Sequence, residues 1–235
     1  MKKYCCLFLM SILTLFCSCD NENWDSEELL KSEGKLSLKS LTVDVDAVVK
    51  EVSRSLNDSS SIDVSNYIIN VINRNTQEIV NTWKYCEMPE IATLNVGEYT
   101  LEVKSHILVA AQWEAPFYCG SKDFSIRKNE VTEVDNVTCV LSNVMVSVRY
   151  SEALYNALGD DVKVTISIGS NGTLEYTRDE TRAGYFELPS MSSTIVAEFT
   201  GSVNGKATSL RRVFTEIAVG QHHIITFSLN SGSVD

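Results

Sequence analysis

The chain has 235 residues, 44% of them apolar, and a formal net charge of −11. An acidic chain with scattered Lys and Arg side chains lacks the basic footprint of a nucleic-acid-binding protein, and anionic lipid headgroups would not attract it. The length and the apolar content suffice for one or two folded domains.

The first residues predict export and a lipid anchor. A pair of lysines precedes the apolar run Leu7–Phe16, which is too short to span a bilayer. The sequence Cys17-Ser18-Cys19 follows, and a small residue directly before a cysteine resembles the bacterial lipobox. Ser18 favours Cys19 as the acylated residue, because a bulky aromatic residue precedes Cys17. We therefore predict a lipoprotein signal peptide at residues 1–18 and a lipid, typically palmitate, on Cys19.

Residues 19–33 are mostly polar and acidic, which is typical of a mobile tether. An acidic run directly after the lipidated cysteine also resembles the surface-export signal of Bacteroidota-type lipoproteins. We therefore expect a protein that is lipid-anchored in the outer membrane and exposed at the cell surface. Loss of the signal removes its two lysines and lowers the net charge from −11 to −13.

Beyond the tether, hydrophobic periodicity predicts strand after strand. Tyr67–Ile72 is apolar on both faces, as in a central strand, whereas residues 162–168 alternate like a half-buried one. Asn171-Gly172 and Asn204-Gly205 are the residue pairs that favour two-residue hairpin turns. Residues 151–158 alone read as helical, with a serine as N-cap. The fold is therefore predicted to be all-β.

The sequence also contains a weak internal repeat. Phe124–Leu141 closes the first half and Phe214–Leu229 closes the second, each as a strand, a tight turn and a final alternating strand. This repetition predicts two antiparallel β-sandwich domains in tandem, at residues 34–142 and 143–235.

Three of the seven cysteines remain after removal of the signal and lipidation: Cys86, Cys119 and Cys139. An exported location permits one disulfide, and Cys86 with Cys119 is the first candidate pair. Cys139 alternates with apolar neighbours and is expected to be a buried thiol. The three histidines lack zinc-site spacing, and Asp160-Asp161 lacks the calcium-loop pattern and reads as a solvated turn. We expect no metal and no cofactor.

Catalytic motifs are not evident, since no serine has the context of a nucleophile elbow, and we expect a protein that is not an enzyme. Trp113, Phe117 and Tyr118 surround a proline and are the candidate ligand-binding residues. Aromatic side chains in a loop can stack on a sugar ring or anchor a partner. The alternative, which we favour, is that they cap the core.

Four segments together resemble a known family: Gly34–Leu38, Leu94–Leu101 with the preceding Tyr85–Glu90, Ala111–Gly120 with the following Asp123–Ile126, and Val131–Val134 with the following Thr138–Leu141. Their order is similar to that in an uncharacterised family of lipid-anchored surface proteins of gut Bacteroidota, related to the fimbrillins. The resemblance implies transthyretin-like, or fimbrillin-like, β-sandwich domains and assigns no catalytic residue. It does not support the disulfide, because the family usually has a polar residue where this chain has Cys119.

These observations lead to two functional expectations. The first is a non-catalytic cell-surface lipoprotein that serves as an adhesin or as an accessory subunit of a fimbria-like assembly. The alternative is a surface glycan-binding lipoprotein that assists polysaccharide capture, with Trp113 and Tyr118 as the stacking platform. The expected partners are the membrane through the lipid, and fimbrial subunits or a surface glycan, with no nucleic acid.

Overall fold

The computed structural model describes residues 32–47, 49–51, 55–56, 62–170, 172–189 and 194–229. The predicted signal peptide, Cys19 and nearly all of the acidic tether lie outside these residues. The described residues form an all-β structure with one short α-helix and one 3₁₀ turn, which confirms the predicted fold class at this level. Among them, no helix has the length and apolar character required to cross a bilayer.

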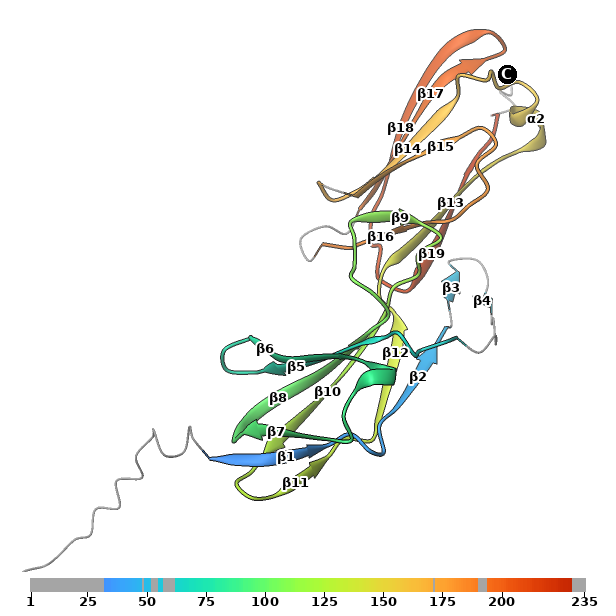
Figure 1. The fold of residues 1–235 in the computed structure, drawn as a ribbon. Helices are drawn as coiled ribbons and strands as arrows, with labels where there is room; N and C mark the ends of the chain where they lie inside the picture. The colour runs from blue at the N-terminus through green and yellow to red at the C-terminus, as the bar shows by residue number, and fades with distance from the viewer. Residues whose placement is uncertain are drawn as a thin grey trace, which may run out of the picture.

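Two sheets form the N-terminal half (Figure 1). The smaller sheet has the order β11-β1-β7 and consists of β1 (Glu33–Ser37), β7 (Ile91–Asn95) and β11 (Val131–Glu133). The larger sheet has the order β2-β12-β10-β8-β5-β6 and consists of β2 (Thr42–Asp46), β5 (Ile68–Asn73), β6 (Ile79–Lys84), β8 (Gly97–Lys104), β10 (Tyr118–Ile126) and β12 (Asn136–Leu141). A 3₁₀ turn, η1 (Tyr85–Glu87), follows β6. Alternation buries Ile69, Val71 and Leu101 in one hydrophobic cluster between the sheets.

Two further sheets form the C-terminal half. One has the order β4-β3-β19-β13-β16-β9 and consists of β3 (Val49–Glu51), β4 (Ser55–Leu56), β9 (Ala111–Trp113), β13 (Val144–Tyr150), β16 (Gly184–Phe186) and β19 (Gln221–Phe227). The other has the order β15-β14-β17-β18 and consists of β14 (Lys163–Ile168), β15 (Gly172–Thr177), β17 (Ile195–Val203) and β18 (Lys206–Phe214). Helix α2 (Glu152–Tyr155) follows β13. Val164, Ile166 and Phe186 are fully buried in a second cluster.

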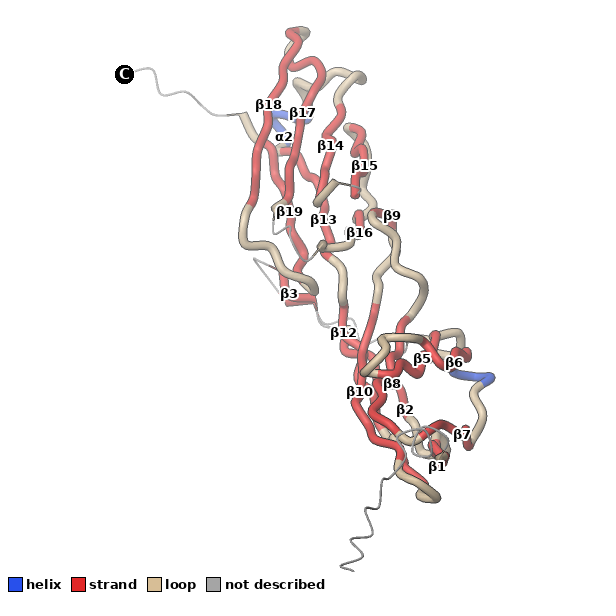
Figure 2. Tube along the Cα trace, turned by 90° about the vertical axis from the view of Figure 1, so that its left-hand side faces the viewer, coloured by secondary structure: helices blue, strands red, loops and turns tan. Residues whose placement is uncertain are grey.

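The two halves follow one another along an elongated molecule (Figure 1). Leu141 belongs to the first hydrophobic cluster and Val144 to the second. The boundary between the clusters does not separate the sheets, because β9 pairs with β16 and β3 pairs with β19. Strands that precede residue 142 therefore lie at both edges of the C-terminal six-stranded sheet (Figure 2). These pairings join the halves through backbone hydrogen bonds.

The expectation of purely antiparallel sheets is wrong. The pairs β1·β11, β2·β12, β13·β19 and β3·β19 are parallel. Apolar alternation determines which face of a strand is buried and carries no information about the direction of its neighbour. In each half, the last strand pairs with a strand from near the start of that half: β12 with β2, and β19 with β13. No hairpin turn connects the two strands of such a pair, so nothing forces them to be antiparallel.

The two Asn-Gly turns differ. Asn204 and Gly205 have φ angles of 51° and 73° and connect the paired residues Val203 and Lys206, which confirms the predicted two-residue turn. The other turn is displaced: Gly172 already belongs to β15, opposite Ile168, and Asn171 lies outside the described residues. A Cβ atom on Gly172 would lie 2.7 Å from the Ala110 carbonyl oxygen, so glycine is required there for close packing.

Helix α2 is shorter than predicted. Its N-cap is confirmed, because the Ser151 hydroxyl accepts a hydrogen bond from the Leu154 backbone N–H at 3.3 Å. The helix stops early because the next residues bond elsewhere: the Ala157 carbonyl accepts from Asn204 at 2.8 Å and Leu158 bridges to Val203. The β17–β18 hairpin thus replaces the second helical turn.

Candidate functional site

The candidate aromatic residues do not form one surface. The residues Phe117 and Tyr118 are only 7% and 8% exposed. Tyr118 belongs to the N-terminal hydrophobic cluster, and the Phe117 ring meets the His106 ring edge-on, with 5.3 Å between centroids. Both side chains therefore serve packing, in agreement with the core-capping interpretation.

Trp113 lies in β9 and packs against the C-terminal cluster instead. Its ring is T-shaped to Tyr176, with 4.6 Å between centroids, and the Arg182 guanidinium lies 4.8 Å from its centroid. Glu180 holds Arg182 through hydrogen bonds of 2.7 and 3.0 Å. The expected stacking platform of Trp113 and Tyr118 is therefore not formed, because β9 carries Trp113 to β16 while Tyr118 starts β10.

The hydroxyl of Tyr176, the residue against which Trp113 packs, links β13 and β16. The Tyr176 hydroxyl donates a hydrogen bond to the Val146 carbonyl at 2.9 Å and accepts one from the Gly184 N–H at 3.1 Å. Tyr176 has no exposed surface, and burial raises its pKa, so the hydroxyl keeps its proton. The packing of Trp113 on Tyr176 thus fixes β9 to β13, β15 and β16.

The expected Cys86–Cys119 disulfide is absent, since all three cysteines of the described residues are free. Cys86 follows β6 and Cys119 lies in β10, with β5 and β8 between these strands. Neighbouring strands are about 4.8 Å apart, so three spacings exceed the roughly 7 Å that a disulfide can bridge between Cα atoms. Cys139 is buried as predicted, and burial raises its pKa to about 12.

The adjacent histidines in β19 have structural partners. The Nε2 atom of His222 lies 3.0 Å from the Ser147 hydroxyl, and that of His223 lies 3.0 Å from the Gln221 amide oxygen. Burial lowers the pKa of His223, which favours its neutral form. Within the part of the chain that the structure describes, no three His, Cys, Asp or Glu side chains are grouped to hold a metal ion.

A polar cleft lies at the far end of the C-terminal half. It has a volume of about 480 Å³ and is formed where β13 ends, at α2 and at the turn after β15. We call it the distal cleft; its lining residues are Val148, Arg149, Tyr150, Tyr155, Arg178, Asp179, Glu180 and Thr181.

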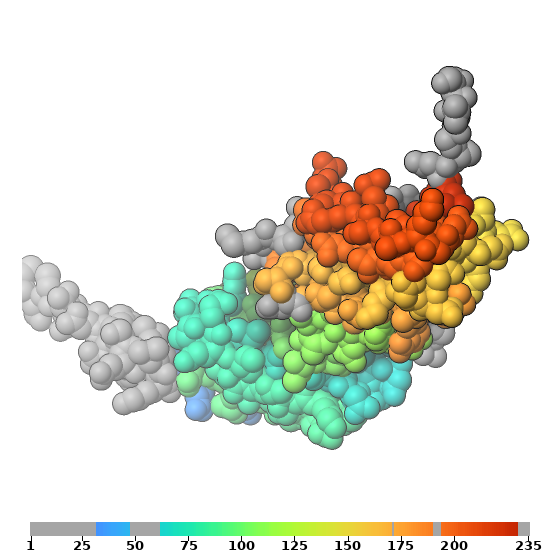
Figure 3. Space-filling view, turned by 90° about the horizontal axis from the view of Figure 1, so that it is seen from above, coloured from blue at the N-terminus to red at the C-terminus, as the bar shows by residue number. Residues whose placement is uncertain are grey.

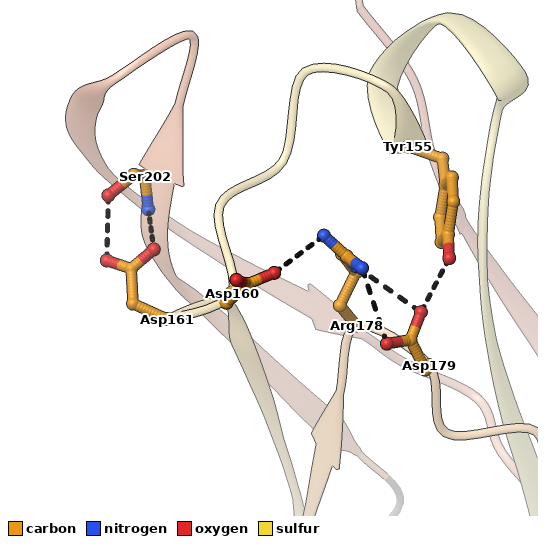
Figure 4. A network of polar contacts seen from close by, with 6 residues as sticks. All are labelled: Tyr155, Asp160, Asp161, Arg178, Asp179 and Ser202. Atoms are coloured by element: carbon orange, nitrogen blue, oxygen red, sulfur yellow. Dashed lines mark hydrogen bonds and ion pairs between the residues drawn. The ribbon is translucent and has the colours of Figure 1, made fainter.

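One arginine organises one side of the distal cleft (Figure 4). Arg178 donates hydrogen bonds to Asp160 at 2.9 Å and to Asp179 at 3.3 Å. The Tyr155 hydroxyl donates to the same Asp179 at 2.6 Å, and the Arg178 guanidinium lies 5.3 Å from the Tyr155 ring centroid. The bonds from Tyr155 and Arg178 lower the pKa of Asp179, whereas Asp179 raises the pKa of Tyr155. The carboxylate therefore stays ionised and the phenol stays protonated.

The Asp160-Asp161 pair does not form an ion-binding loop. Asp160 faces Arg178, while Asp161 accepts hydrogen bonds from the Ser202 N–H at 3.0 Å and its hydroxyl at 2.8 Å (Figure 4). These bonds from Ser202 lower the pKa of Asp161. The two carboxylates thus diverge, one toward the distal cleft and the other toward the β17–β18 hairpin.

Two polar groups of the distal cleft are unpaired. Arg149 is exposed and has no carboxylate within ion-pair distance among the described residues. The Tyr150 hydroxyl is buried without a hydrogen-bond partner there, and burial raises its pKa to about 12. Sequence analysis missed this site because Arg149 reads as the polar side of a strand and Tyr155 as a helical surface residue. The only signal in its vicinity was Asp160-Asp161.

Solved structures similar to this chain include three proteins of Bacteroides and Parabacteroides. A fimbrial assembly protein of Parabacteroides distasonis is 8% identical, with a TM-score of 0.42, over 86% of this chain and 92% of its own. A candidate cell adhesion protein of Bacteroides fragilis is 11% identical, with a TM-score of 0.36, over 82% and 95%. A candidate polysaccharide-binding protein of Bacteroides thetaiotaomicron is 8% identical, with a TM-score of 0.42, over 86% and 93%.

The search of curated proteins found no match. The family described as a domain of unknown function, DUF4493, matches residues 32–235. This range contains all four segments that carried the resemblance to an uncharacterised family, and the match confirms it. Because the match spans most of the sequence, the chain belongs to the DUF4493 family.

Proposed function

We propose that this protein is a non-catalytic cell-surface lipoprotein that serves as an adhesin or as an accessory subunit of a fimbria-like assembly. In this proposal residues 34–142 and 143–235 are tandem β-sandwich domains, and the lipid on Cys19 holds them at the outer membrane. The observation that carries the proposal is the placement of the ends. The described chain enters at β1, at one end of the elongated molecule, while α2 and the distal cleft lie at the other (Figure 1).

An anchor at the β1 end would present the distal cleft away from the membrane. Seen from above, that end consists of segments coloured yellow to red, with the blue-green N-terminal half farther from the viewer (Figure 3). A contact surface at the free end of a tethered rod would be accessible to a partner outside the cell. The polar groups on one side of the cleft hold one another in place, and such a preorganised surface is suited to binding.

A second feature supports a role as a subunit. Strand β18 is the outermost strand of its sheet and pairs with β17 over nine residues. The outer edge of such a strand offers backbone N–H and C=O groups to a strand from another chain. Assembly by strand addition would therefore use a surface separate from the distal cleft.

The alternative function, capture of a surface glycan for uptake, is favoured by one observation. Tyr155 is 40% exposed beside polar groups that fix one another. The stacking surface expected at Trp113 and Tyr118 would then be replaced by Tyr155.

The test is deletion of the gene in the native host, with complementation by the wild-type chain or by Cys19→Ala. Deletion should reduce adherence to a host-cell layer or the yield of surface fibres, and Cys19→Ala should not restore either. A protease added to intact cells should degrade the wild-type protein. Unchanged adherence and fibres in the deletion strain, with protection of the protein from external protease, would refute the proposal.

A further inference from the structure

We propose that the distal cleft binds an acidic glycan, meaning a sugar that carries a carboxylate or sulfate group. The inference deepens the proposed function, on which it rests for its biological use. It commits to Arg149 as the residue that recognises the oxyanion and to Tyr155 as the surface on which the sugar ring packs.

Arg149 leaves hydrogen-bond donors of the distal cleft without a carboxylate partner. A guanidinium carries five N–H donors and no acceptor, and all those of Arg149 are without a carboxylate partner among the described residues. The carboxylates that line the cleft are already engaged, Asp179 by Arg178 and Tyr155, and Glu180 by Arg182. A ligand group that complements Arg149 therefore brings acceptor oxygens. An oxyanion does so best, because a guanidinium can donate two parallel bonds to it.

The aromatic ring of Tyr155 is held in place by its neighbours. The Tyr155 hydroxyl is held by Asp179 at 2.6 Å and the ring carries the Arg178 guanidinium at 5.3 Å, so little freedom is lost when a ligand packs on it. Tyr155 is 40% exposed, and its exposed surface combines an apolar ring with polar groups around it. A sugar has the matching character, with C–H groups on the face of its ring and hydroxyls around its edge.

The size of the cleft suits a small ligand, and the charge of the chain limits how an anionic ligand is attracted. The volume of about 480 Å³ lies within the range of about 300–1,000 Å³ that small-ligand sites occupy. The net charge of −11 opposes the approach of a polyanion, so anionic ligands are not gathered by the protein as a whole. Recognition of an acidic sugar would have to be local, through Arg149, and would weaken as salt concentration rises.

Binding to immobilised polysaccharides tests the inference, with oligogalacturonate as the carboxylate probe, dextran sulfate as the sulfate probe and plain dextran as the neutral probe. The wild-type chain should bind at least one acidic probe and bind dextran more weakly. Arg149→Gln should lower the affinity about tenfold, because it removes a charge-assisted hydrogen bond. The exposed Arg149 side chain has no hydrogen bond or ion pair among the described residues, so this variant should melt like the wild type.

Arg212→Gln is the matched control, because Arg212 is an exposed arginine of β18 and does not line the cleft. It should bind like the wild type, whereas Tyr155→Ala should bind like Arg149→Gln. The inference is overturned if neither acidic probe binds, if dextran binds equally well, or if Arg149→Gln and Arg212→Gln behave alike. Reduced adherence of the deletion strain would leave the proposed function standing even then.

Discussion

The substitution Trp113→Ala distinguishes a structural tryptophan from a ligand-binding one. Trp113 is half-buried, so truncation to alanine loses roughly 100 Å² of buried apolar surface, and each Å² of such burial stabilises the fold by about 25 cal/mol. This burial contributes about 2.5 kcal/mol, and loss of the edge-to-face contact with Tyr176 adds about 1 kcal/mol. The free energy of unfolding should therefore fall by about 3.5 kcal/mol, which corresponds to a lower Tm of about 7–14 °C for a chain of this size.

Urea unfolding followed by far-UV circular dichroism measures this loss. Trp113→Phe is the matched control: it retains a ring against Tyr176 and should lose less than half as much stability. If Trp113→Ala unfolded at the wild-type urea concentration and instead lost polysaccharide binding, Trp113 would be a ligand surface and the packing account would be wrong.

Three further predictions follow from individual groups. Mass-spectrometric mapping of alkylated thiols should find Cys86 modified in the native protein and Cys139 modified only after unfolding, because Cys139 is buried. If Cys86 and Cys119 were both protected from alkylation and a reductant removed that protection, the two residues would form a disulfide. Hydrogen bonds from Arg182 lower the pKa of Glu180 from its ordinary 4.5 to about 2, so this contribution to stability is complete above pH 4.5 and is lost as the pH falls toward 2. Urea midpoints at about pH 5 and about pH 2.5 should therefore differ less in Glu180→Gln than in the wild type, and an equal difference would refute the assignment. Metabolic labelling with a palmitate analogue should be lost in Cys19→Ala, whereas label lost from Cys17→Ala instead would move the anchor.

Local features of the fold could be predicted from the sequence because local chemistry determines them. Alternating residues 162–168 bury one face of a strand, and Asn204-Gly205 supplies the positive φ angles of a two-residue turn. Strand direction and sheet membership depend on non-local pairing. The strand with Trp113 has the same pattern whether it joins β10 or β16, so the pattern could not reveal that it crosses into the other half.

The distal cleft escaped sequence analysis for a related reason. Arg149, Tyr155 and Arg178 come from three elements and have no fixed spacing, and each is an ordinary surface residue in its own segment. Tertiary contacts bring these residues together. The turn after β15 places Arg178 over the Tyr155 ring, and α2 is short because its next residues bond to the β17–β18 hairpin. The aromatic cluster at Trp113 stood out because its residues are neighbours in sequence, although folding separates them into two cores.

Adherence of the deletion strain, complemented with single variants, tests most directly the claim that a tethered protein makes contact through its distal cleft. Cells that carry the wild-type chain, Arg149→Gln or Arg212→Gln should be compared on a surface coated with the acidic polysaccharide that the purified protein binds. We expect the Arg149→Gln strain to adhere as poorly as the deletion strain, and the Arg212→Gln strain to adhere like the wild type. Full adherence of the Arg149→Gln strain, with the deletion strain deficient, would place the contact surface elsewhere on the molecule.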